Sequence, residues 1–286
     1  MIRVYFDTNI FEDIVKGKID ISIKKLNSFK NINYYISTAH IEEYYIAIKN
    51  DIQNKYSVDN QKRKDLMTEL KCNGILNPSR SQIVNYPENF DTCLQRVKEY
   101  DTTELIKERS IEIHKSRYNF YNNLIKEQAK AKNYSNLTPE KIWEESEIKS
   151  SLSKIGVCIK LRSFQIYLDL INIYGLETVP KLKSIDDSKL YKSCFKEIHN
   201  QYFLMETIFE YLHALLNKYG YNADKNVQTV TSGVYDIAHS IYGTYCDYFV
   251  SNDTRLRKRI SAIYYYLGVP TKVITFEEFL KIANKQ

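Results

Sequence analysis

Four acidic residues stand at positions from which their side chains could meet and carry out chemistry: Asp7, Glu43, Asp236 and Asp253. Clustered carboxylates repel one another unless a positive charge lies among them. A hard divalent cation with oxygen ligands, such as Mg²⁺ or Mn²⁺, supplies that charge. Such a site can clamp a phosphodiester and activate a water molecule, so the four acids predict metal-dependent hydrolysis of a phosphate ester.

The elements predicted around two of these acids place them at one edge of a sheet. The apolar run 2–6 is typical of a buried strand, and it ends at Asp7. The short apolar run 248–250 also predicts a strand, and the turn after it holds Asp253, which caps the helix predicted for 254–267. Ligands of a parallel sheet bind beyond the carboxyl ends of its strands, so we expect both acids at that edge.

The other two acids lie on predicted helices that begin at the same edge. Glu43 is near the start of the helix after a second strand, predicted for 33–36. Asp236 is in the first part of the helix predicted for 230–245, which runs antiparallel to the strands. Four carboxylates from distant parts of the chain are therefore expected to converge.

The alternation of strands and helices at both chain ends predicts an α/β fold with a parallel sheet covered on both faces. The middle of the chain holds long helical patterns, including one helix predicted for 188–219, and 73–87 is predicted to be a loop. The simplest architecture is an α/β domain formed by residues 1–59 and 228–286. A helical insertion of unknown role, residues 60–227, interrupts it.

Composition narrows the class of protein without identifying it. With 41 basic and 35 acidic residues among 286, the net charge is +6, which suits a polyanionic partner and equally suits a solvated surface. The five cysteines are widely spaced and odd in number, which favours reduced thiols over a disulfide framework. No apolar run is long enough to span a membrane and no signal peptide is recognisable, so we predict a cytoplasmic location and no membrane partner.

Several of these residues also have simpler structural interpretations. Asp7 and Asp253 could be helix caps alone. His239, one turn from Asp236, is better explained as a hydrogen-bonded structural residue than as a catalytic base. Asp247 begins the strand that Asp253 follows, and at about 3.3 Å per residue it should lie roughly 15–20 Å away, in a structural role at the opposite edge.

Basic residues in two regions leave a choice between substrate contact and solvated surface. The first group follows Asp253 and the second lies in the middle of the chain: Arg255, Arg257, Lys258 and Arg259, and then Arg117, Lys160 and Arg162. Either group could hold the phosphates of a nucleic acid. Charge alone does not decide between phosphate contact and a solvated surface.

Three stretches of sequence resemble the motifs of the PIN-domain nucleases. VYFDTNIF (4–11) resembles the first motif, with Asp7 as its acid and Asn9 as the accompanying polar residue. ISTAHIEEYY (36–45) resembles the second, where the spacing favours Glu43 over Glu42. DIAHSIYGTYCDYFVSND (236–253) resembles the third and fourth together and ends in Ser-Asn-Asp. Ser251 stands where the family has Thr or Ser.

This resemblance covers the two ends of the chain and implies a PIN-like endoribonuclease that uses Mg²⁺ or Mn²⁺. The four matched acids would bind the metal, water would attack the phosphate in line, and Asn9 and Ser251 would orient ligands or phosphate. The chain is much longer than compact PIN toxins, and its helical insertion has no recognised counterpart. The role as toxin, defence protein or housekeeping enzyme stays open, as do a protein regulator and homodimerisation.

Three alternatives accompany this hypothesis. A structure-specific DNA nuclease belongs to the wider superfamily. An inactive PIN-like scaffold would bind RNA or protein without cutting, although a scaffold has no need of mutually repelling carboxylates. A phosphatase of the haloacid dehalogenase type requires a second Asp two residues after the first, and Asn9 occupies that position.

Overall fold

The computed structural model describes residues 1–79, 81–102, 134–152, 191–223 and 227–285, and between them residues 160, 164–165, 167–169, 171–172 and 175. Arg117, Cys158 and Arg162 lie outside the described residues, and so does most of the apolar run 157–174, for which the sequence predicts a helix. The four described cysteines are free thiols. Within the described part of the chain, no helix is both long enough and apolar enough to cross a membrane.

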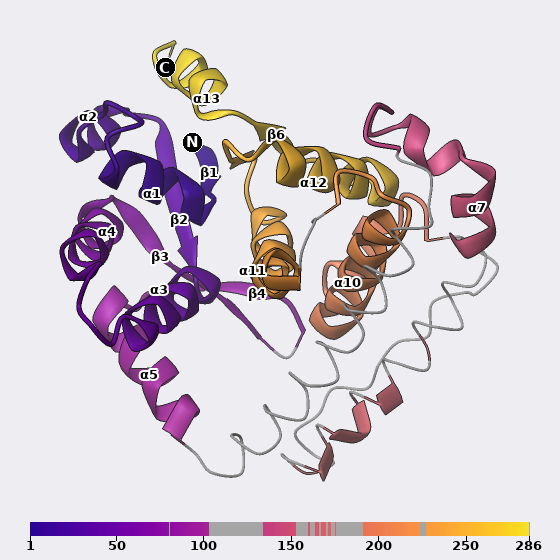
Figure 1. Cartoon of the computed structure of the whole chain (residues 1–286), viewed down its shortest axis with the longest axis horizontal. Coiled ribbons are helices and arrows are strands. Elements are labelled where there is room, and N and C mark those ends of the chain that lie inside the picture. Colours follow the sequence, from indigo (N-terminus) through magenta and orange to yellow (C-terminus); the bar gives the residue numbers. More distant parts are fainter. Residues whose placement is uncertain are drawn as a thin grey trace.

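A six-stranded sheet in the order β4-β3-β2-β1-β5-β6 forms the centre of the fold (Figure 1). All neighbouring strands are parallel except the pair β3 and β4. The α/β fold with a mostly parallel sheet is therefore confirmed. The strands are β1 (Ile2–Phe6), β2 (Ile32–Ser37), β3 (Cys72–Pro78), β4 (Ile83–Tyr86), β5 (Tyr248–Val250) and β6 (Lys272–Ile274).

Helices cover both faces of the sheet. Successive residues of β1 point alternately to one face and to the other. Val4 and Phe6 pack into one core and Tyr5 into the other, as the two-residue period of a strand requires. Helices that contribute to the core around Val4 and Phe6 are α1 (Thr8–Val15), α2 (Ile23–Ser28), α3 (Thr38–Asn50), α4 (Ser57–Glu69), α5 (Phe90–Thr102) and α13 (Phe276–Ala283). The Tyr5 core includes α10 (Tyr202–Lys218), α11 (Val227–Gly243) and α12 (Thr254–Leu267), together with the short elements η1 (Lys141–Glu144), α7 (Ser146–Leu152) and α9 (Phe195–Ile198).

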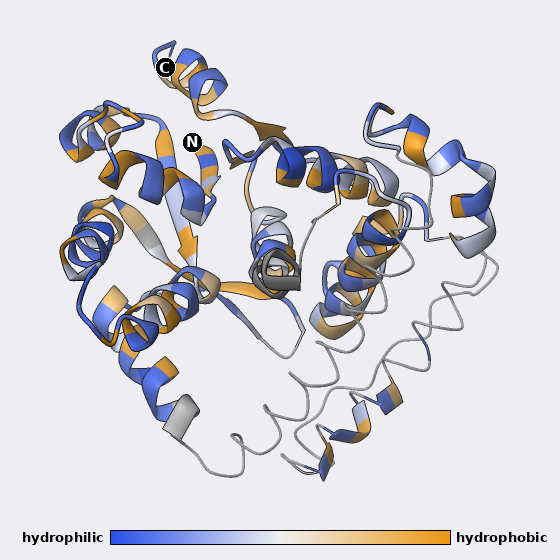
Figure 2. Cartoon of the chain, viewed as in Figure 1, coloured by the Kyte–Doolittle hydropathy of each residue, from blue (hydrophilic) through white to orange (hydrophobic). Residues whose placement is uncertain are grey.

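These helices carry hydrophobic and hydrophilic residues in alternation along their length (Figure 2), as expected for elements with one face on a core. Helix α10 lies in the range assigned to the insertion, yet it packs against α11 and α12 in the same core as Tyr5. The range 60–227 thus contributes directly to the covering of the sheet.

The loop predicted for 73–87 is wrong, because β3 and β4 occupy most of it. Its glycine and prolines suggested a break, but both residue types are accommodated in the strands. Gly74 has φ +124°, and a Cβ placed there would lie 2.3 Å from the carbonyl oxygen of Tyr86 on the neighbouring strand, so glycine permits the close pairing. Pro78 is the last residue of β3, where proline removes little of the hydrogen bonding.

The single helix predicted for 188–219 is also wrong, because α9 ends at Ile198 and α10 begins at Tyr202. The backbone N–H of Tyr202 donates to the carbonyl of Ser81, in the turn between β3 and β4, at 3.0 Å. That long-range bond replaces a helical one, and the amphipathic periodicity on either side of the break conceals it.

Gly243, the last residue of α11, packs without a side chain against the sheet and α12. A Cβ placed there would lie 2.5 Å from Cδ2 of Phe249 and 2.7 Å from the hydroxyl oxygen of Tyr264. Both rings are fully buried, so Gly243→Ala should lower the free energy of unfolding by about 1–3 kcal/mol through overpacking. Urea denaturation measures the change, and an unaltered midpoint would contradict this account of the packing.

Candidate functional site

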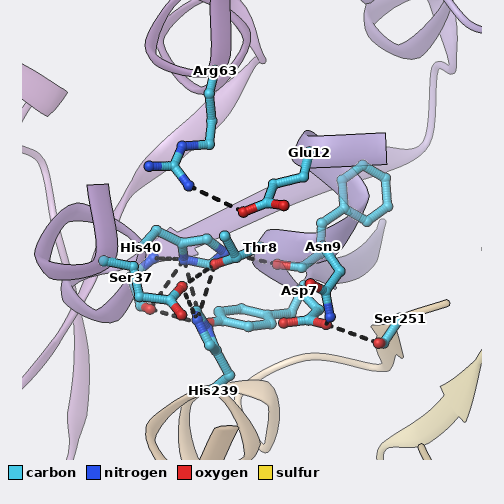
Figure 3. A network of polar contacts seen from close by, with 12 residues as sticks. Asp7, Thr8, Asn9, Glu12, Ser37, His40, Arg63, His239 and Ser251 are labelled. Atoms are coloured by element: carbon cyan, nitrogen blue, oxygen red, sulfur yellow. Dashed lines mark hydrogen bonds and ion pairs between the residues drawn. The ribbon is translucent and has the colours of Figure 1, made fainter. Parts of the chain in front are cut away.

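Asp7 lies at the carboxyl end of β1 and is 2% exposed. Its backbone N–H continues the pairing of β1 with β5 by donating to the carbonyl of Val250 at 2.9 Å. Its Oδ2 accepts hydrogen bonds from the hydroxyl of Ser251 at 2.8 Å and from Nδ2 of Asn9 at 2.9 Å (Figure 3). The structure therefore brings together three of the residues singled out from the sequence.

The position of Asp7 in the sheet is the one that favours ligand binding. From β1 the chain passes to β2 and β3 on one side, whereas β5 and β6 lie on the other. The strand order reverses between β1 and β5, and the crevice outside the carboxyl ends at such a reversal is where open α/β sheets bind ligands. Asp7 follows β1 and Ser251 follows β5, so both stand at this switch point.

Asp253 is joined to Asp7 through Ser251. The backbone N–H of Asp253 donates to the Ser251 hydroxyl oxygen at 3.1 Å, and that hydroxyl donates to Asp7. Asp253 also caps α12, because its Oδ1 accepts from the N–H groups of Arg255 and Leu256 at 2.8 and 3.0 Å. Asp253 therefore caps the helix as predicted, and both capping bonds use the same one of its two carboxylate oxygens.

Glu43 faces the same edge from α3, held by two partners. Its Oε2 accepts a hydrogen bond from the Thr8 hydroxyl. The same oxygen lies 2.9 Å from Nε2 of His239, which is 1% exposed. Burial alone would raise the pKa of Glu43, but the charge and hydrogen bond of His239 outweigh it and hold that pKa below its ordinary value. The same pairing raises the pKa of His239 although burial opposes this. Glu43 and His239 therefore favour the charged pair.

Hydrogen bonds assign different roles to the two histidines at the site, whose rings are 4.5 Å apart. His40 accepts at Nδ1 from the N–H of Ser37 at 3.0 Å, so it donates from Nε2 to the carbonyl of Phe6 at 2.8 Å. It is neutral, since burial and then the charge of His239 lower its pKa well below the ordinary value. The Tyr5 hydroxyl lies 2.6 Å from Nδ1 of His239 and completes its hydrogen bonding. The expectation of a hydrogen-bonded histidine at 239 agrees with these contacts.

Asp236 is engaged by a buried arginine. Its Oδ2 lies 3.1 Å from Nη2 of Arg259, which is 3% exposed and also donates to Asn217 at 3.0 Å. Arg259 was expected either to face substrate or to join a solvated basic surface, and its burial contradicts both. The charge of Asp236 contributes to the raised pKa of His239, which places Asp236 within electrostatic range of the site.

Asp7 itself is surrounded chiefly by neutral donors and by acids. Burial raises its pKa to about 6; the charge of His239 and the Ser251 hydrogen bond oppose the shift, while Glu43 and Asp253 add to it. Among the described residues, the hydrogen bonds to its carboxylate come from an amide and a hydroxyl, not from a cation. An ionised Asp7 is thus costly in this structure, and a bound cation would remove the cost.

The donors present suit a hard divalent cation in kind, but the four carboxylates do not form one closed cage. Among the described residues, no three His, Cys, Asp or Glu side chains are close enough together to hold a metal ion. Mg²⁺ commonly keeps several waters and is held by one or two carboxylates plus substrate phosphate. Asp7, with Asp253 linked to it through Ser251, fits an open site of that type.

Sequence reasoning missed the residues that surround Glu42. Glu42 is exposed, yet the protein packed around it raises its pKa to about 7, with His239 and Arg96 opposing the shift and Glu43 and Glu206 adding to it. Arg96 and Glu206 come from α5 and α10, in the range assigned to the insertion. No sequence spacing could have placed them here, because only the tertiary packing of those helices brings them to α3.

Asp247 behaves as expected of a residue at the opposite edge. It precedes β5 and forms an ion pair with Arg3 of β1 at 2.9 Å, and it accepts from the Arg3 backbone N–H at 2.8 Å. Its side chain and that of Arg3 are both about two-fifths exposed. This pair is the natural control for the acids beyond the other ends of the same strands.

Comparisons of the chain with protein-family models, with curated proteins and with solved structures found no match.

Proposed function

We propose that this chain is a divalent-metal-dependent nuclease with a PIN-like fold, which hydrolyses RNA phosphodiester bonds at Asp7. The observation that carries the proposal is the buried Asp7 carboxylate at the reversal of strand order, oriented by Asn9 and Ser251 and joined through Ser251 to Asp253. A buried acid whose hydrogen-bond donors are neutral is poorly suited to a purely structural role, since it costs stability when ionised.

Each residue has a distinct part in this proposal. Asp7 and Asp253 would hold a Mg²⁺ or Mn²⁺ ion, which when bound would polarise the phosphate and lower the pKa of an attacking water. Asn9 and Ser251 fix the rotamer of Asp7. Glu43, kept ionised by His239 and Thr8, faces the same edge as the acidic half of an ion pair.

The assignment to RNA rests on the resemblance of the three motif stretches to PIN-domain nucleases, and the chemistry at Asp7 would serve DNA equally. The matched carboxylates favour a nuclease over a scaffold. Asp236, the fourth matched acid, would tune the charge of His239 while it is held by Arg259.

Purified protein tests the proposal directly. We expect it to cut single-stranded RNA internally in the presence of Mn²⁺ or Mg²⁺ and to lose that activity in EDTA. Asp7→Asn should reduce kcat by about three orders of magnitude, because the metal's contribution to the transition state is several kcal/mol. Asp247→Asn, at the opposite edge, is the matched control and should cut like the unaltered protein.

Single-stranded DNA and flap substrates, assayed in parallel, decide the substrate class. Faster cleavage of DNA would replace RNA in the proposal without altering the site. No cleavage of any nucleic acid with Mn²⁺, or an Asp7→Asn variant as active as the parent, would contradict the proposal. A Mn²⁺-soaked crystal gives an independent result, with metal density expected beside Asp7.

A further inference from the structure

Arg96 on α5 is an exposed cation whose guanidinium is held in place. Its Nη2 donates to Oδ1 of Asn77 at 2.7 Å and to Oε1 of Glu88 at 2.6 Å. Asn77, next to the last residue of β3, is 3% exposed and itself donates to Glu88, whereas the Arg96 side chain is 51% exposed. The hydrogen bonds that the described residues make with Arg96 all use Nη2. The N–H groups of Nη1 and Nε can therefore donate to a ligand.

The position of Arg96 relates it to the acids. It lies within electrostatic range of Glu42, whose neighbour Glu43 faces the site, because each of Arg96 and Glu42 affects the pKa of the other. Helix α5 packs against α3, which carries both glutamates. The anchor of Arg96, Asn77, stands at the carboxyl end of β3, so this cation flanks the β3 side of the edge that holds Asp7.

A second anchored arginine flanks the β5 side of the same edge. Arg257 on α12 donates from Nη1 to the carbonyl of Ser251 at 2.9 Å and from Nη2 to the hydroxyl of Thr254 at 3.3 Å. Ser251 is the residue whose hydroxyl orients Asp7. Arg257 is therefore fixed to the loop that forms one side of the site.

The spacing between these anchors matches a chain of phosphates better than a single small ligand. The ends of β3 and β5 are separated by β2 and β1, which is three inter-strand steps of about 4.8 Å, or roughly 14 Å. Asp7 lies between them, at the end of β1. A polynucleotide strand that crosses the strand ends would meet a guanidinium on each side of the acids.

We propose that Arg96 and Arg257 mark the path of one polynucleotide strand across the carboxyl edge of the sheet, each binding a phosphate on opposite sides of the scissile one. This inference rests on the proposed nuclease function and specifies its substrate as a polymer held through its backbone. An anchored, planar guanidinium suits phosphate, because it keeps N–H donors beyond those that anchor it and loses little side-chain entropy on binding.

Salt dependence of binding tests the phosphate contacts. Fluorescence anisotropy with a labelled single-stranded RNA, in the Asp7→Asn protein and Mg²⁺, measures affinity without cleavage. Each lost phosphate contact should reduce the slope of log K against log salt by about 0.7, so Arg96→Gln and Arg257→Gln should each do so and the double variant should lose about 1.4. Affinity at moderate salt should fall several-fold for each.

Arg3→Gln is the matched control. Like Arg96, Arg3 is exposed and forms an ion pair with a carboxylate, but it lies at the opposite edge of the sheet. Its substitution should leave the salt slope unaltered. Arg96→Lys keeps the charge and should recover most of the slope, whereas a purely structural role for Arg96 would show as a lower melting temperature with the slope intact.

The active protein separates this inference from the proposed function. With single-stranded RNA, Arg96→Gln should raise KM more than it lowers kcat. The loss should be larger on RNA than on bis(p-nitrophenyl) phosphate, which can occupy only the site at Asp7. If hydrolysis depends on Asp7 but the salt slopes of Arg96→Gln and Arg3→Gln agree, the proposed path of the polynucleotide is wrong and the proposed nuclease function is retained. If no substrate is cut, the function itself fails.

Discussion

Replacing Asp7 with asparagine is expected to raise the melting temperature of the metal-free protein at neutral pH, even though it removes the proposed catalytic carboxylate. Burial raises the pKa of Asp7 from 3.8 to about 6, so the ionised form is disfavoured in the folded state. Asparagine carries no charge, and its amide oxygen can accept the same hydrogen bonds from Asn9 and Ser251.

The sign and pH window follow from linkage. Between pH 3.8 and about 6 the folded state holds a proton at Asp7 that the unfolded state has released, so stability falls as pH rises through this range. Above it the cost is fully present. A shift of about two pKa units corresponds to on the order of 2–3 kcal/mol, which for a chain of this size is a change in Tm of roughly 5 °C.

Thermal melts in EDTA across this pH range measure the difference. The Asp7→Asn protein and its parent should melt together near pH 4 and diverge as pH approaches neutrality. Asp247→Asn should show no such gain, because hydrogen bonds from Arg3 outweigh burial and lower the pKa of Asp247. Mn²⁺ should raise the Tm of the parent and have little effect on Asp7→Asn. An Asp7→Asn protein that melts below its parent at every pH would contradict the cost assigned to this carboxylate.

His239→Leu is expected to have the second large effect, a loss of about 3 kcal/mol of unfolding free energy. The substitution leaves the carboxylate of Glu43, only 24% exposed, without its positive partner, and it removes one of the hydrogen-bond partners of the Tyr5 hydroxyl, which keeps Ser37. Removing one partner of a buried ion pair lowers the free energy of unfolding by more than the pair contributes to it, because the remaining charge stays desolvated.

The contribution of this pair also has a pH window. The pKa of Glu43 is lowered, so its part is complete above its ordinary value of 4.5 and is lost as pH falls through the folded value. The pKa of His239 is raised, so its part is complete below 6.5 and is lost as pH rises through the folded value. Both parts are complete between 4.5 and 6.5, and the comparison is best made there.

A double-mutant cycle isolates the pair. Glu43→Gln removes the charge that His239→Leu exposes, so the double variant should be more stable than the sum of the single losses by on the order of 1–3 kcal/mol. Urea denaturation gives the four free energies. Tyr5→Phe, which removes a hydroxyl and keeps the ring, is the control and should cost about 1 kcal/mol. Strict additivity of the two changes would show that the 2.9 Å contact carries no stability.

The C-terminal elements could be predicted from the sequence because local signals there agree with the fold. The capping box of Thr275 with Glu278 starts α13, Asp253 caps α12, and Gly268 at φ +75° ends it. In the middle of the chain local and long-range signals conflict. Gly74 is a turn residue by composition and a strand residue by its pairing with β4, and only the presence of that neighbour decides between them.

The candidate site shows the same difference between residues predicted from local signals and residues placed by long-range contacts. The rule that ligands lie beyond the carboxyl ends of parallel strands placed Asp7 and Asp253 at one edge, since Asp7 directly follows β1 and Asp253 lies in the turn after β5, while Ser251 was singled out by the motif resemblance. The partners of Glu43 and Asp236 could not be predicted, because they depend on which side chains face one another across helices. His239 pairs with Glu43 across 196 positions of sequence, and no local pattern records that contact.

The central pairing of β1 with β5 has a consequence for how the protein is made. Strand β1 is synthesised well before its neighbour β5, which follows some 244 residues later, as the register of Val4 with Tyr248 shows. Contacts of such long sequence separation form slowly, because the intervening chain must first be ordered. A growing chain on the ribosome thus carries Asp7 without Ser251, Asp253 or Arg257 until translation has passed β5. The surroundings of Asp7 are therefore completed only after β5 has been made, so the order of residues along the chain sets when the candidate site can assemble.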